Sequence, residues 1–593
     1  MRELVLAIGT VGGIALRRSP VRMITAVVLM VLQAVAMPLA APWLGALVDA
    51  AIDRDPAAAT RAGTAIAVAL IGAVTFGHFA HIVYFELIEL LIADLDERLM
   101  RVAGDSDTMA HHDRPEYADH LAAVRQQLHR IAWSLQALLS GTGILTAMVI
   151  TAIILARVSP WLLLLPLLAI PPLLTGRRAE ALVDAARTTS AERSRLALHI
   201  YGLMTKASTS KEVRLCRLTP RLLDEHGKLW RETTATLWRA EIRAAALRIA
   251  GLLSFAVGYL GAVLLVVDHT VRGNGSVGTV VLTVSLAAQV HFQVSHGIGL
   301  LQEMDGAASV VRRLRWLESA AAQSAPPPGH AVPERITTGI RLRGVGFSYP
   351  EAEGPVLADV DCVLPAGSTV ALVGENGAGK STLVKLLCRF YDPAAGAIEV
   401  DGVDIAGFAV PEWRSRIAAG FQDFARFQLP VRQTVGVGDV PRVDDEAAAA
   451  AALERAGGTD VVEGLPDGWS TQLGKAYADG AELSGGQWQK LALGRAMMRT
   501  DPLLLILDEP SAALDAETEH RLFEQYAAGA RQASQRTGTV TLLVTHRFST
   551  VRIADLIIVV GDGGILEFGS HATLMQRGGT YAELYSIQAA AYR

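Results

Sequence analysis

The chain has 593 residues, of which 51% are hydrophobic and 19% charged, and its mean hydropathy is +0.32. A chain of this length is expected to form at least two domains, and one this apolar is not expected to be fully soluble. The formal net charge of −5 argues against a nucleic-acid partner, because such proteins usually carry a basic excess. The three cysteines are widely spaced, so we expect neither a disulfide framework nor a cysteine metal site.

The first half of the chain contains apolar stretches long enough to cross a membrane. A helix of about 20 apolar residues crosses the roughly 30 Å hydrocarbon core of a bilayer. Six stretches without Asp, Glu, Lys or Arg meet this requirement, at 23–48, 62–85, 131–156, 158–176, 249–267 and 276–302. They predict an all-α transmembrane domain of six helices.

Basic residues predict the orientation of these spans. Several arginines precede the first span at 17–22, and Arg177 and Arg178 follow the fourth. The linkers after the first, third and fifth spans are short and poor in basic residues. Because cytoplasmic loops carry the excess of Lys and Arg, we expect a multi-pass protein of the plasma membrane with a cytoplasmic N-terminus. With six spans, everything from residue 303 onward is cytoplasmic too.

The linkers expected inside the cell, 93–130 and 177–248, are long and have helical composition, so we expect the helices to continue into the cytoplasm. Some spans also contain polar residues, which need partners or water. These are His78, His81, Gln289, His291, Gln293 and His296. Positions 289, 293 and 296 share one helical face. Hydrogen bonding between helices and a polar substrate cavity both explain them, and the two readings stay open.

A change of composition separates the two halves of the chain. Residues 319–333 are rich in Ala, Ser and Pro, which disfavours regular structure. Short strands alternate with helices after this stretch, as in an α/β domain. We therefore expect a transmembrane domain at 1–318, a linker at 319–336 and an α/β domain at 337–593.

The strongest local motif is Gly374-Glu-Asn-Gly-Ala-Gly379-Lys380-Ser381. It follows the apolar strand 368–373 and opens a helix, which is the context that a P-loop requires. Its glycines let backbone N–H groups approach phosphates, and the helix N-terminus adds positive potential. Lys380 is expected to reach the β- and γ-phosphates, and the Ser381 hydroxyl to bind Mg²⁺. The nucleotide-binding residues predicted here are Gly374, Asn376, Gly377, Gly379, Lys380, Ser381 and Thr382.

Two further strands end in polar residues that suit phosphoryl transfer. The apolar strand 503–507 ends in Asp508 and Glu509. We expect Asp508 to hold Mg²⁺ and Glu509 to orient and polarise the attacking water. The strand 540–544 is followed by His546, which is placed to contact the γ-phosphate. A lone acidic pair or a lone histidine is usually structural, so these assignments depend on the motifs occurring together.

At this point the chain resembles a family, the ATP-binding cassette (ABC) transporters. Leu483-Ser-Gly-Gly-Gln487 matches the family's signature sequence and lies upstream of Asp508 as the family requires. The resemblance covers about 337–588, and the six spans fit an exporter-type membrane domain. It implies a P-loop nucleotide-binding domain with a helical signature subdomain, and ATP and Mg²⁺ as cofactors.

The resemblance also implies roles for single residues. Tyr349 looks like the aromatic that stacks on adenine, although it also suits an ordinary strand. Gln422 resembles the Q-loop glutamine, which senses Mg²⁺ and water. His546 resembles the switch histidine, and Ser511-Ala-Ala-Leu-Asp515 resembles the D-loop that acts across the dimer. Glu509, His546 and Gln422 are thus the predicted catalytic residues, and Ser381, Gln422 and Asp508 the predicted metal ligands.

In this family two cassettes pack head to tail. The signature of one, here Ser484, Gly485, Gly486 and Gln487, completes the ATP site of the other. The chain is therefore expected to form a homodimer, or a heterodimer with a second half-transporter. The segment 473–480 departs from the family pattern. The contact that the family assigns to this loop is therefore not predicted for this chain. Residues 112–117 and 210–215 resemble regions near the helices that couple the membrane domain to the cassettes.

The resemblance implies an ATPase that exports an amphiphilic or peptide-like substrate by alternating access. Small-molecule, lipid and peptide substrates all stay open. Two alternatives are an importer on the same fold, for example of siderophore-like cargo, and a membrane-anchored regulatory ATPase that does not transport. The intact Lys380, Glu509 and His546 disfavour the regulatory reading. The spans exclude a soluble cassette ATPase of the DNA-repair type.

Overall fold

The computed structural model describes residues 2–104, 108–109, 113–164, 167–322, 329–350, 352, 354–509, 534–545 and 551–591. Its internal contacts divide the chain into two compact units. We call Met1–Arg101 with His120–Trp316 the membrane unit, and Val102–Asp119 with Leu317–Arg593 the cassette unit. The short segment Val102–Asp119 thus belongs with the cassette. The prediction of one continuous transmembrane domain at 1–318 did not include this.

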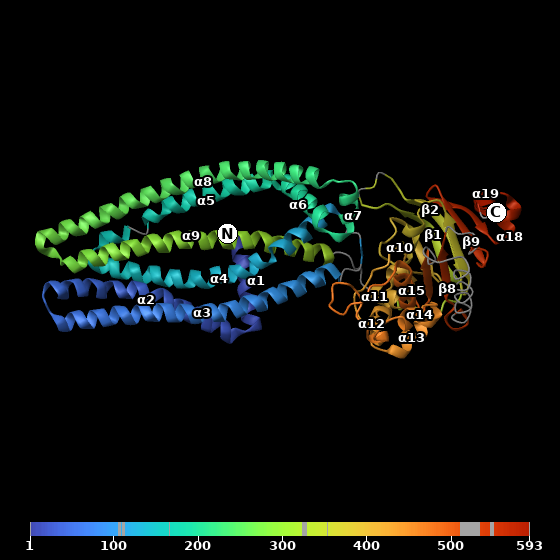
Figure 1. Cartoon of the computed structure of the whole chain (residues 1–593), viewed down its shortest axis with the longest axis horizontal. Coiled ribbons are helices and arrows are strands. Elements are labelled where there is room, and N and C mark those ends of the chain that lie inside the picture. The colour runs from blue at the N-terminus through green and yellow to red at the C-terminus, as the bar shows by residue number, and fades with distance from the viewer. Residues whose placement is uncertain are drawn as a thin grey trace. The chain divides into compact units, whose positions relative to one another are not determined.

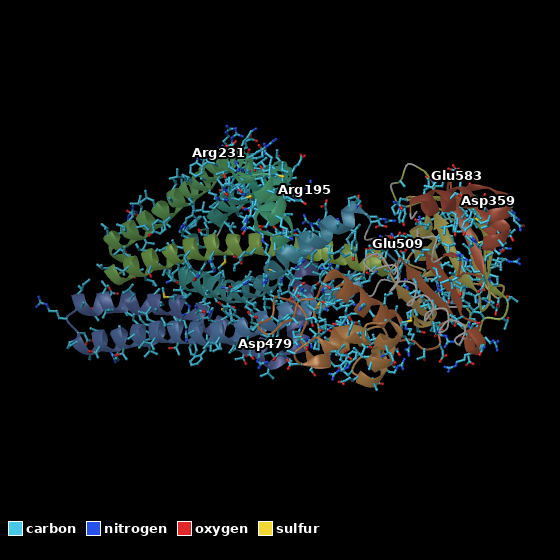
Figure 2. All side chains as sticks on the ribbon, turned by 45° about the vertical axis from the view of Figure 1, so that its right-hand side comes forward. Arg195, Arg231, Asp359, Asp479, Glu509 and Glu583 are labelled. Atoms are coloured by element: carbon cyan, nitrogen blue, oxygen red, sulfur yellow. The ribbon has the colours of Figure 1, made fainter. Side chains whose placement is uncertain are left out.

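The membrane unit is helical. Its helices are α1 (Arg2–Arg18), α2 (Pro20–Ile52), α3 (Pro56–Gly104), α4 (Pro115–Val158), α5 (Ile170–Thr189), α6 (Ala191–Thr205), α7 (Ala207–Leu215), α8 (Thr219–His269) and α9 (Val277–Ala322), with the short turns η1 (Pro160–Leu164), η2 (Leu167–Ala169) and η3 (Thr270–Asn274). By length and composition, the helices α2, α3, α4, α8 and α9 can each cross a membrane. Their long continuations agree with the expected extension of helices beyond the bilayer. Figure 2 shows charged side chains gathered around Arg195 and Arg231.

The fourth predicted span, 158–176, is not a single long helix in the described residues. The chain forms the 3₁₀ turns η1 and η2 there, and α5 begins only at Ile170. Pro160, Pro171 and Pro172 lie in this stretch, and proline removes a backbone donor that a continuing helix needs. Within the described residues, five helices rather than six therefore meet the length and composition of a span.

Two contacts between helices of the membrane unit join segments far apart in the chain. The helix α5 packs along α8, as Figure 1 shows. The helices α2 and α9 are joined by Asp49, whose carboxylate accepts hydrogen bonds from Ser276 Oγ at 2.6 Å and from the Gly278 amide at 2.7 Å. Gly278 lies in the first turn of α9, where the unpaired N–H groups of the helix favour an anion. This contact fixes the end of α2 against the start of α9.

The cassette unit contains two sheets (Figure 1). The strands are β1 (Gly339–Phe347), β2 (Leu357–Pro365), β3 (Thr369–Gly374), β4 (Ala395–Val400), β5 (Val403–Asp404), β6 (Ile417–Gly420), β7 (Leu504–Asp508), β8 (Val540–Val544), β9 (Leu556–Gly561) and β10 (Gly564–Gly569). One antiparallel sheet has the order β2-β1-β4-β5, and the other has the order β10-β9-β3-β8-β7-β6. In the second sheet all neighbours pair in parallel except β9 and β10.

Short helices and turns surround these sheets. They are α10 (Lys380–Leu387), η4 (Ile405–Gly407), α11 (Val410–Ser415), α12 (Val431–Gly436), η5 (Val440–Arg442), α13 (Glu446–Arg455), α14 (Thr459–Glu463), η6 (Gly468–Ser470), α15 (Gly485–Ala496), α18 (His571–Arg577) and α19 (Thr580–Ala591). The central strands β7 and β8 are buried along their whole length, so they are apolar without alternation. One core lies between the two sheets and α10, and a second joins α12, α13 and α15 to the parallel sheet.

The segment Val102–Asp119 contacts the cassette at the end of α10. The amide of Met109 donates to the carbonyl of Phe390 at 2.8 Å. The Tyr391 hydroxyl donates to the Asp113 carboxylate in a short hydrogen bond. Burial and this carboxylate both raise the pKa of Tyr391. The predicted coupling region near 112–117 therefore includes at least one residue, Asp113, that contacts the cassette directly.

Candidate nucleotide site

Four neighbouring parallel strands deliver the predicted site residues to one edge of the sheet. Because β3, β8, β7 and β6 run in parallel and in this order, their carboxyl ends meet there. The P-loop follows β3, Asp508 ends β7, and Gln422 lies two residues after β6. The order of the strands in the sheet therefore brings these motifs, which are far apart in the sequence, close together.

The P-loop has the backbone that a phosphate site needs. Gly377 and Gly379 have φ of 87° and 100°, in the left-handed region that favours glycine. A Cβ on Gly377 would meet no atom within 4 Å, so the loop leaves open space above its backbone. The helix α10 begins immediately afterwards at Lys380, with its first N–H groups turned towards this loop. Such a helix start favours a bound anion.

Lys380 is folded back onto the loop. Its Nζ donates to the carbonyls of Gly374 at 2.9 Å and Glu375 at 2.8 Å. Burial lowers the pKa of Lys380, while the nearby carboxylates of Glu509 and Asp508 oppose that shift. The ammonium group thus lies within the charge field of both acids, and it is held by two neutral acceptors that a phosphate oxygen can replace.

The pocket beside the P-loop is also lined by Asp508, Glu509 and Gln422. The side-chain amide of Gln422 donates to Glu509 Oε2 at 2.8 Å. Glu509 has φ of 46°, which is uncommon outside glycine and is typical of strained functional positions. Burial, together with the neighbouring carboxylates of Glu509 and Asp423, raises the pKa of Asp508 to about 6, and the Lys380 ammonium opposes this shift. The sequence did not mark Asp423 as a residue that affects the ionisation of Asp508.

These residues line one open pocket of about 500 Å³. Its lining comprises Val356, Asn376, Gly377, Gly379, Lys380, Ser381, Thr382, Gln422, Asp508, Glu509 and Val544. Within the described residues, no cluster of three His, Cys, Asp or Glu side chains is able to hold a metal on its own. Mg²⁺ commonly takes only one or two protein ligands besides water and substrate phosphates. Ser381 and Asp508 in a phosphate pocket fit this pattern.

Comparison with known proteins identifies the fold around this pocket. Residues 357–512 match the ABC transporter family. The chain carries an ABC transporter domain. The whole chain also superposes on the structure of a bacterial Atm1-family ABC exporter with ATP bound, with a TM-score of 0.80 over 97% of this chain and 98% of that one. The sequence identity is 24%, so this likeness establishes the fold alone, which is that of the Atm1-family exporter.

Several curated relatives are similar over part of their length. Proteins named ATP-dependent lipid A-core flippase match from Burkholderia orbicola, 41% identical over 267 residues, and Chromohalobacter salexigens, 39% over 262. A third, from Aromatoleum aromaticum, is 36% identical over 334 residues. The matches cover 45%, 44% and 55% of this chain, and 43%, 43% and 52% of the relatives, in that order. This chain therefore aligns with about half of each relative or less.

Tyr349 lies beside the P-loop helix of the ABC transporter domain. Its hydroxyl is 3.2 Å from Thr382 Oγ1 and accepts from Lys385 Nζ at 3.2 Å. Its ring packs edge-on against Tyr391 at 5.4 Å and is partly buried. Tyr349 does not line the pocket above, so its stacking on adenine stays a prediction. Lys385 and Tyr391 are neighbours that sequence reasoning missed, because nothing in their local sequence marks them.

The signature residues lie apart from this pocket. Ser484 caps α15, accepting from the Gln487 amide at 3.3 Å, while Gln487 Oε1 accepts from the Ser484 amide at 2.9 Å. Ser484 and Gly485 are exposed, and a Cβ on Gly485 would meet nothing within 4 Å. The start of α15 is thus an accessible helix N-terminus within this chain. The remaining predicted residues, His546 and the D-loop with Ser511 and Asp515, lie outside the described residues.

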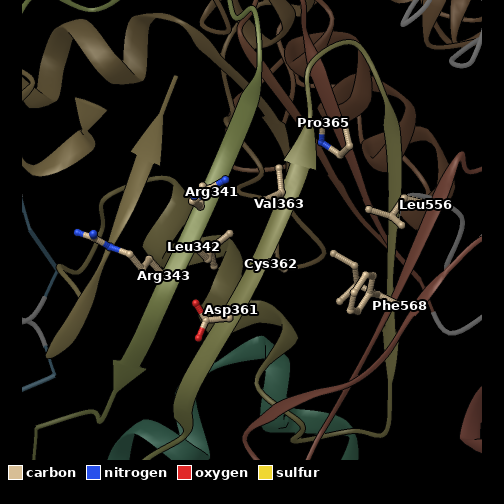
Figure 3. A pocket seen from close by; sticks show the side chains of 10 residues that line it. Arg341, Leu342, Arg343, Asp361, Cys362, Val363, Pro365, Leu556 and Phe568 are labelled. Carbon is tan, nitrogen blue, oxygen red and sulfur yellow. The ribbon is translucent and has the colours of Figure 1, made fainter. Parts of the chain in front are cut away.

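A second hollow of about 500 Å³ lies between the edges of the two sheets (Figure 3). Two of its charged groups already have partners, since Arg343 pairs with Glu399 at 3.1 Å and Asp361 accepts from the Gly344 amide at 3.1 Å. Burial raises the pKa of the Cys362 thiol in its wall to about 12, so this thiol is not a nucleophile at neutral pH. The P-loop pocket is therefore the better candidate for the catalytic site of the two.

Proposed function

We propose that this chain is one half of an ATP-driven exporter. The observation that carries the proposal is the contact of Gln422 with Glu509 in the pocket of about 500 Å³ that Lys380 also lines, in a chain with apolar helices long enough to cross a membrane. A soluble nucleotide-binding protein does not require membrane-crossing helices, and a passive channel does not require a nucleotide pocket. The combination of the two therefore favours an ATP-driven transporter.

The residues suggest how hydrolysis is divided among them. The P-loop amides and Lys380 bind the β- and γ-phosphates, and the two carbonyls now holding Lys380 release it to do so. Ser381, Asp508 and Gln422 would hold Mg²⁺, which would supply positive charge to the phosphates. Glu509 accepts a hydrogen bond from water and orients it, while Gln422 positions that carboxylate. His546 is proposed to contact the γ-phosphate.

The exposed signature helix favours a dimer. A helix N-terminus favours an anion, and the exposed one at Ser484 lines no phosphate pocket among the described residues of its own chain. We infer that Ser484, Gly485, Gly486 and Gln487 complete the pocket of a second chain, with Asp515 acting across the interface. A homodimer and a heterodimer with a similar chain both satisfy this geometry.

The relatives favour a lipid-like substrate. The similar proteins named above are called lipid A-core flippases, and the membrane unit of this chain is predominantly apolar. We infer an amphiphilic substrate moved outward by alternating access between two states. The basic residues near the first span favour a plasma-membrane protein with its N-terminus and cassette in the cytoplasm. An even number of crossings then requires the chain from η1 to α5 to cross as well.

The test is ATP hydrolysis by the purified chain in lipid nanodiscs, with Glu509→Gln as the comparison. We expect Mg²⁺-dependent turnover that Glu509→Gln nearly abolishes. Turnover that survives this substitution would remove Glu509 from the mechanism. An inactive wild-type chain that still binds nucleotide would exclude a self-sufficient homodimer and leave the heterodimer.

A further inference from the structure

A third cavity lies inside the membrane unit, far along the chain from the nucleotide pocket. It is an open cleft of about 610 Å³ between α1, α4, α5 and α9. One face of α4, from Ala137 to Met148, and one face of α9, from Gln293 to Met304, supply most of its lining. These faces belong to helices that can each cross a membrane. Pockets of this size, mostly apolar with few polar groups, are typical of small-molecule sites.

Two glycines keep this cleft open. Gly141 on α4 and Gly297 on α9 both line it, and a Cβ on either would meet no atom within 4 Å. By contrast, Gly143 on the same helix α4 is packed, because its Cβ would come within 2.9 Å of the Met30 carbonyl. The glycines of the cleft therefore face space rather than a neighbouring helix.

One polar side chain in the lining has an unmet hydrogen bond. Gln293 is 6% exposed, and its Nε2 donates to Thr151 Oγ1 at 3.1 Å. Its Oε1 is buried and has no partner among the described residues. With Nε2 assigned to the bond with Thr151, the atom that lacks a partner is the oxygen, which can only accept. A buried polar group left unpaired is costly, so Gln293 favours a ligand that brings a donor.

The other polar groups of the cleft do not compete for this role. Thr142 is already bonded, donating from its hydroxyl to the Leu139 carbonyl at 2.7 Å. The lining contains no Asp, Glu, Lys or Arg, so it offers nothing to a charged peptide or a phosphate. At the end opposite Gln293 the cleft is bounded by Ile8, Leu300 and Met304, which pack together. The cleft is therefore mostly apolar, and Gln293 at one end is the lining residue whose side-chain oxygen lacks a partner among the described residues.

From these observations we propose that the cleft binds an alkyl chain of the transported amphiphile, and that Gln293 recognises a hydroxyl or amide donor on it. This rests on the proposed export function and adds the substrate class and the residue that selects it. In the cleft the alkyl chain contacts α4 and α9 in place of the lipid chains of the bilayer. The donor satisfies the amide oxygen of Gln293 after a small rotation of the side chain. Gln293 is thus a specificity-determining residue rather than only a link between helices.

The experiment uses the full chain in nanodiscs and two photoreactive probes. One is hexadecanol with a diazirine in its chain, and the other is the matching hexadecyl methyl ether, which has no donor. Labelled peptides are mapped by mass spectrometry without nucleotide. We expect both probes to label the cleft faces of α4 and α9, and the alcohol to do so about tenfold more efficiently, the size of one buried hydrogen bond left unmade. Equal labelling by the two probes would overturn the role of Gln293.

Variants separate the two parts of the proposal. Gln293→Leu is expected to abolish the preference for the alcohol while the ether still labels. Gly141→Phe and Gly297→Phe, from opposite walls, are each expected to reduce labelling by both probes several-fold. Gly261→Phe is the matched control, since this glycine of α8 also faces open space but does not line the cleft. Undiminished labelling in both cleft-filling variants would overturn the site.

A last arm tests whether the bound amphiphile is the cargo. Mg²⁺, ATP and vanadate are expected to reduce the labelling of the wild-type cleft several-fold, as the cargo leaves. Unchanged labelling in protein that hydrolyses ATP would mean a resident lipid and overturn the substrate assignment. The nucleotide-free labelling does not depend on hydrolysis. A chain that labels as expected but never hydrolyses ATP would therefore exclude a self-sufficient homodimeric exporter and leave the cleft site standing.

Discussion

The Gln422 side-chain amide donates to Glu509 Oε2 at 2.8 Å, across 87 residues of sequence. The two residues follow the adjacent parallel strands β6 and β7, which is why they meet. This contact fixes the carboxylate at the mouth of the pocket, in reach of both the metal ligands and the P-loop. It also couples the glutamine to the acid that is proposed to orient water.

Glu509→Gln is therefore expected to retain nucleotide binding and lose hydrolysis by about 10² to 10⁴-fold, the usual contribution of a positioned acid or base. Steady-state ATPase activity and binding of a fluorescent ATP analogue measure the two properties separately. Glu583→Gln is a matched control, because this glutamate is exposed on α19 (Figure 2) and distant in sequence from the site. A parallel loss of binding would mean that Glu509 is structural.

Lys380→Ala is expected to weaken nucleotide binding itself. A charge-assisted hydrogen bond contributes about 1.5–3 kcal/mol, which corresponds to roughly ten- to a hundredfold in Kd. The ammonium group is released from two backbone carbonyls rather than from water, so part of its desolvation has occurred before binding. Titration calorimetry with ATP and Mg²⁺ measures the effect. Lys228→Ala, an exposed residue of α8, should leave Kd unchanged.

Asp508 should make the nucleotide-free protein less stable at neutral pH. Its pKa is about 6 in the folded chain, above its ordinary value of 3.8. Folding therefore disfavours the charged form, and this penalty is fully present above about pH 6 and disappears below 3.8. The shift corresponds to at most about 3 kcal/mol.

Asp508→Asn should accordingly raise the apparent Tm without nucleotide at pH 7.5, and the gain should shrink as the pH falls to 5. Thermal scans at several pH values measure this. The same variant should lose Mg²⁺-dependent hydrolysis. A gain in Tm that stays constant with pH would contradict the assigned ionisation.

Tyr391→Phe is expected to loosen the segment Val102–Asp119 from the cassette. The substitution removes the hydrogen bond to Asp113 and keeps the ring packing against Phe347 and Tyr349. Hydrogen exchange at the Met109 amide should become about tenfold faster, since a hydrogen bond to a charged group is lost. Asp113→Asn should have a similar effect, and the double variant should add little to either. Full additivity would show that the two side chains act separately.

Gly278→Ala is expected to destabilise the membrane unit. A Cβ there would come within 2.2 Å of the Gly45 carbonyl and 2.4 Å of the Asp49 carboxylate, so α2 and α9 must separate. Overpacking of this kind costs about 1–3 kcal/mol. Thermal unfolding in detergent measures the loss against Gly261→Ala, where the added methyl meets nothing within 4 Å. Equal Tm values would mean that the helices adjust freely.

The sequence by itself determined the parts of this protein that local chemistry dictates. A run of apolar residues must avoid water, and a glycine-rich turn between a buried strand and a helix creates a phosphate cradle wherever it occurs, so most spans and the P-loop were predictable. The match of 357–512 to the ABC transporter family agrees with that reading. The stretch 158–176 differs from a single helix because hydropathy counts apolar side chains and takes no account of the backbone donors that prolines remove.

Only the tertiary structure decided which distant residues meet. Strand order brought Gln422 to Glu509, and the return of the chain at 102–119 brought Asp113 to Tyr391. The same holds for the cleft at Gln293, whose polar character was visible in the sequence while its missing partner was not. Each depends on packing between segments far apart in the chain, and such contacts follow from the free energy of the whole fold rather than from any local pattern.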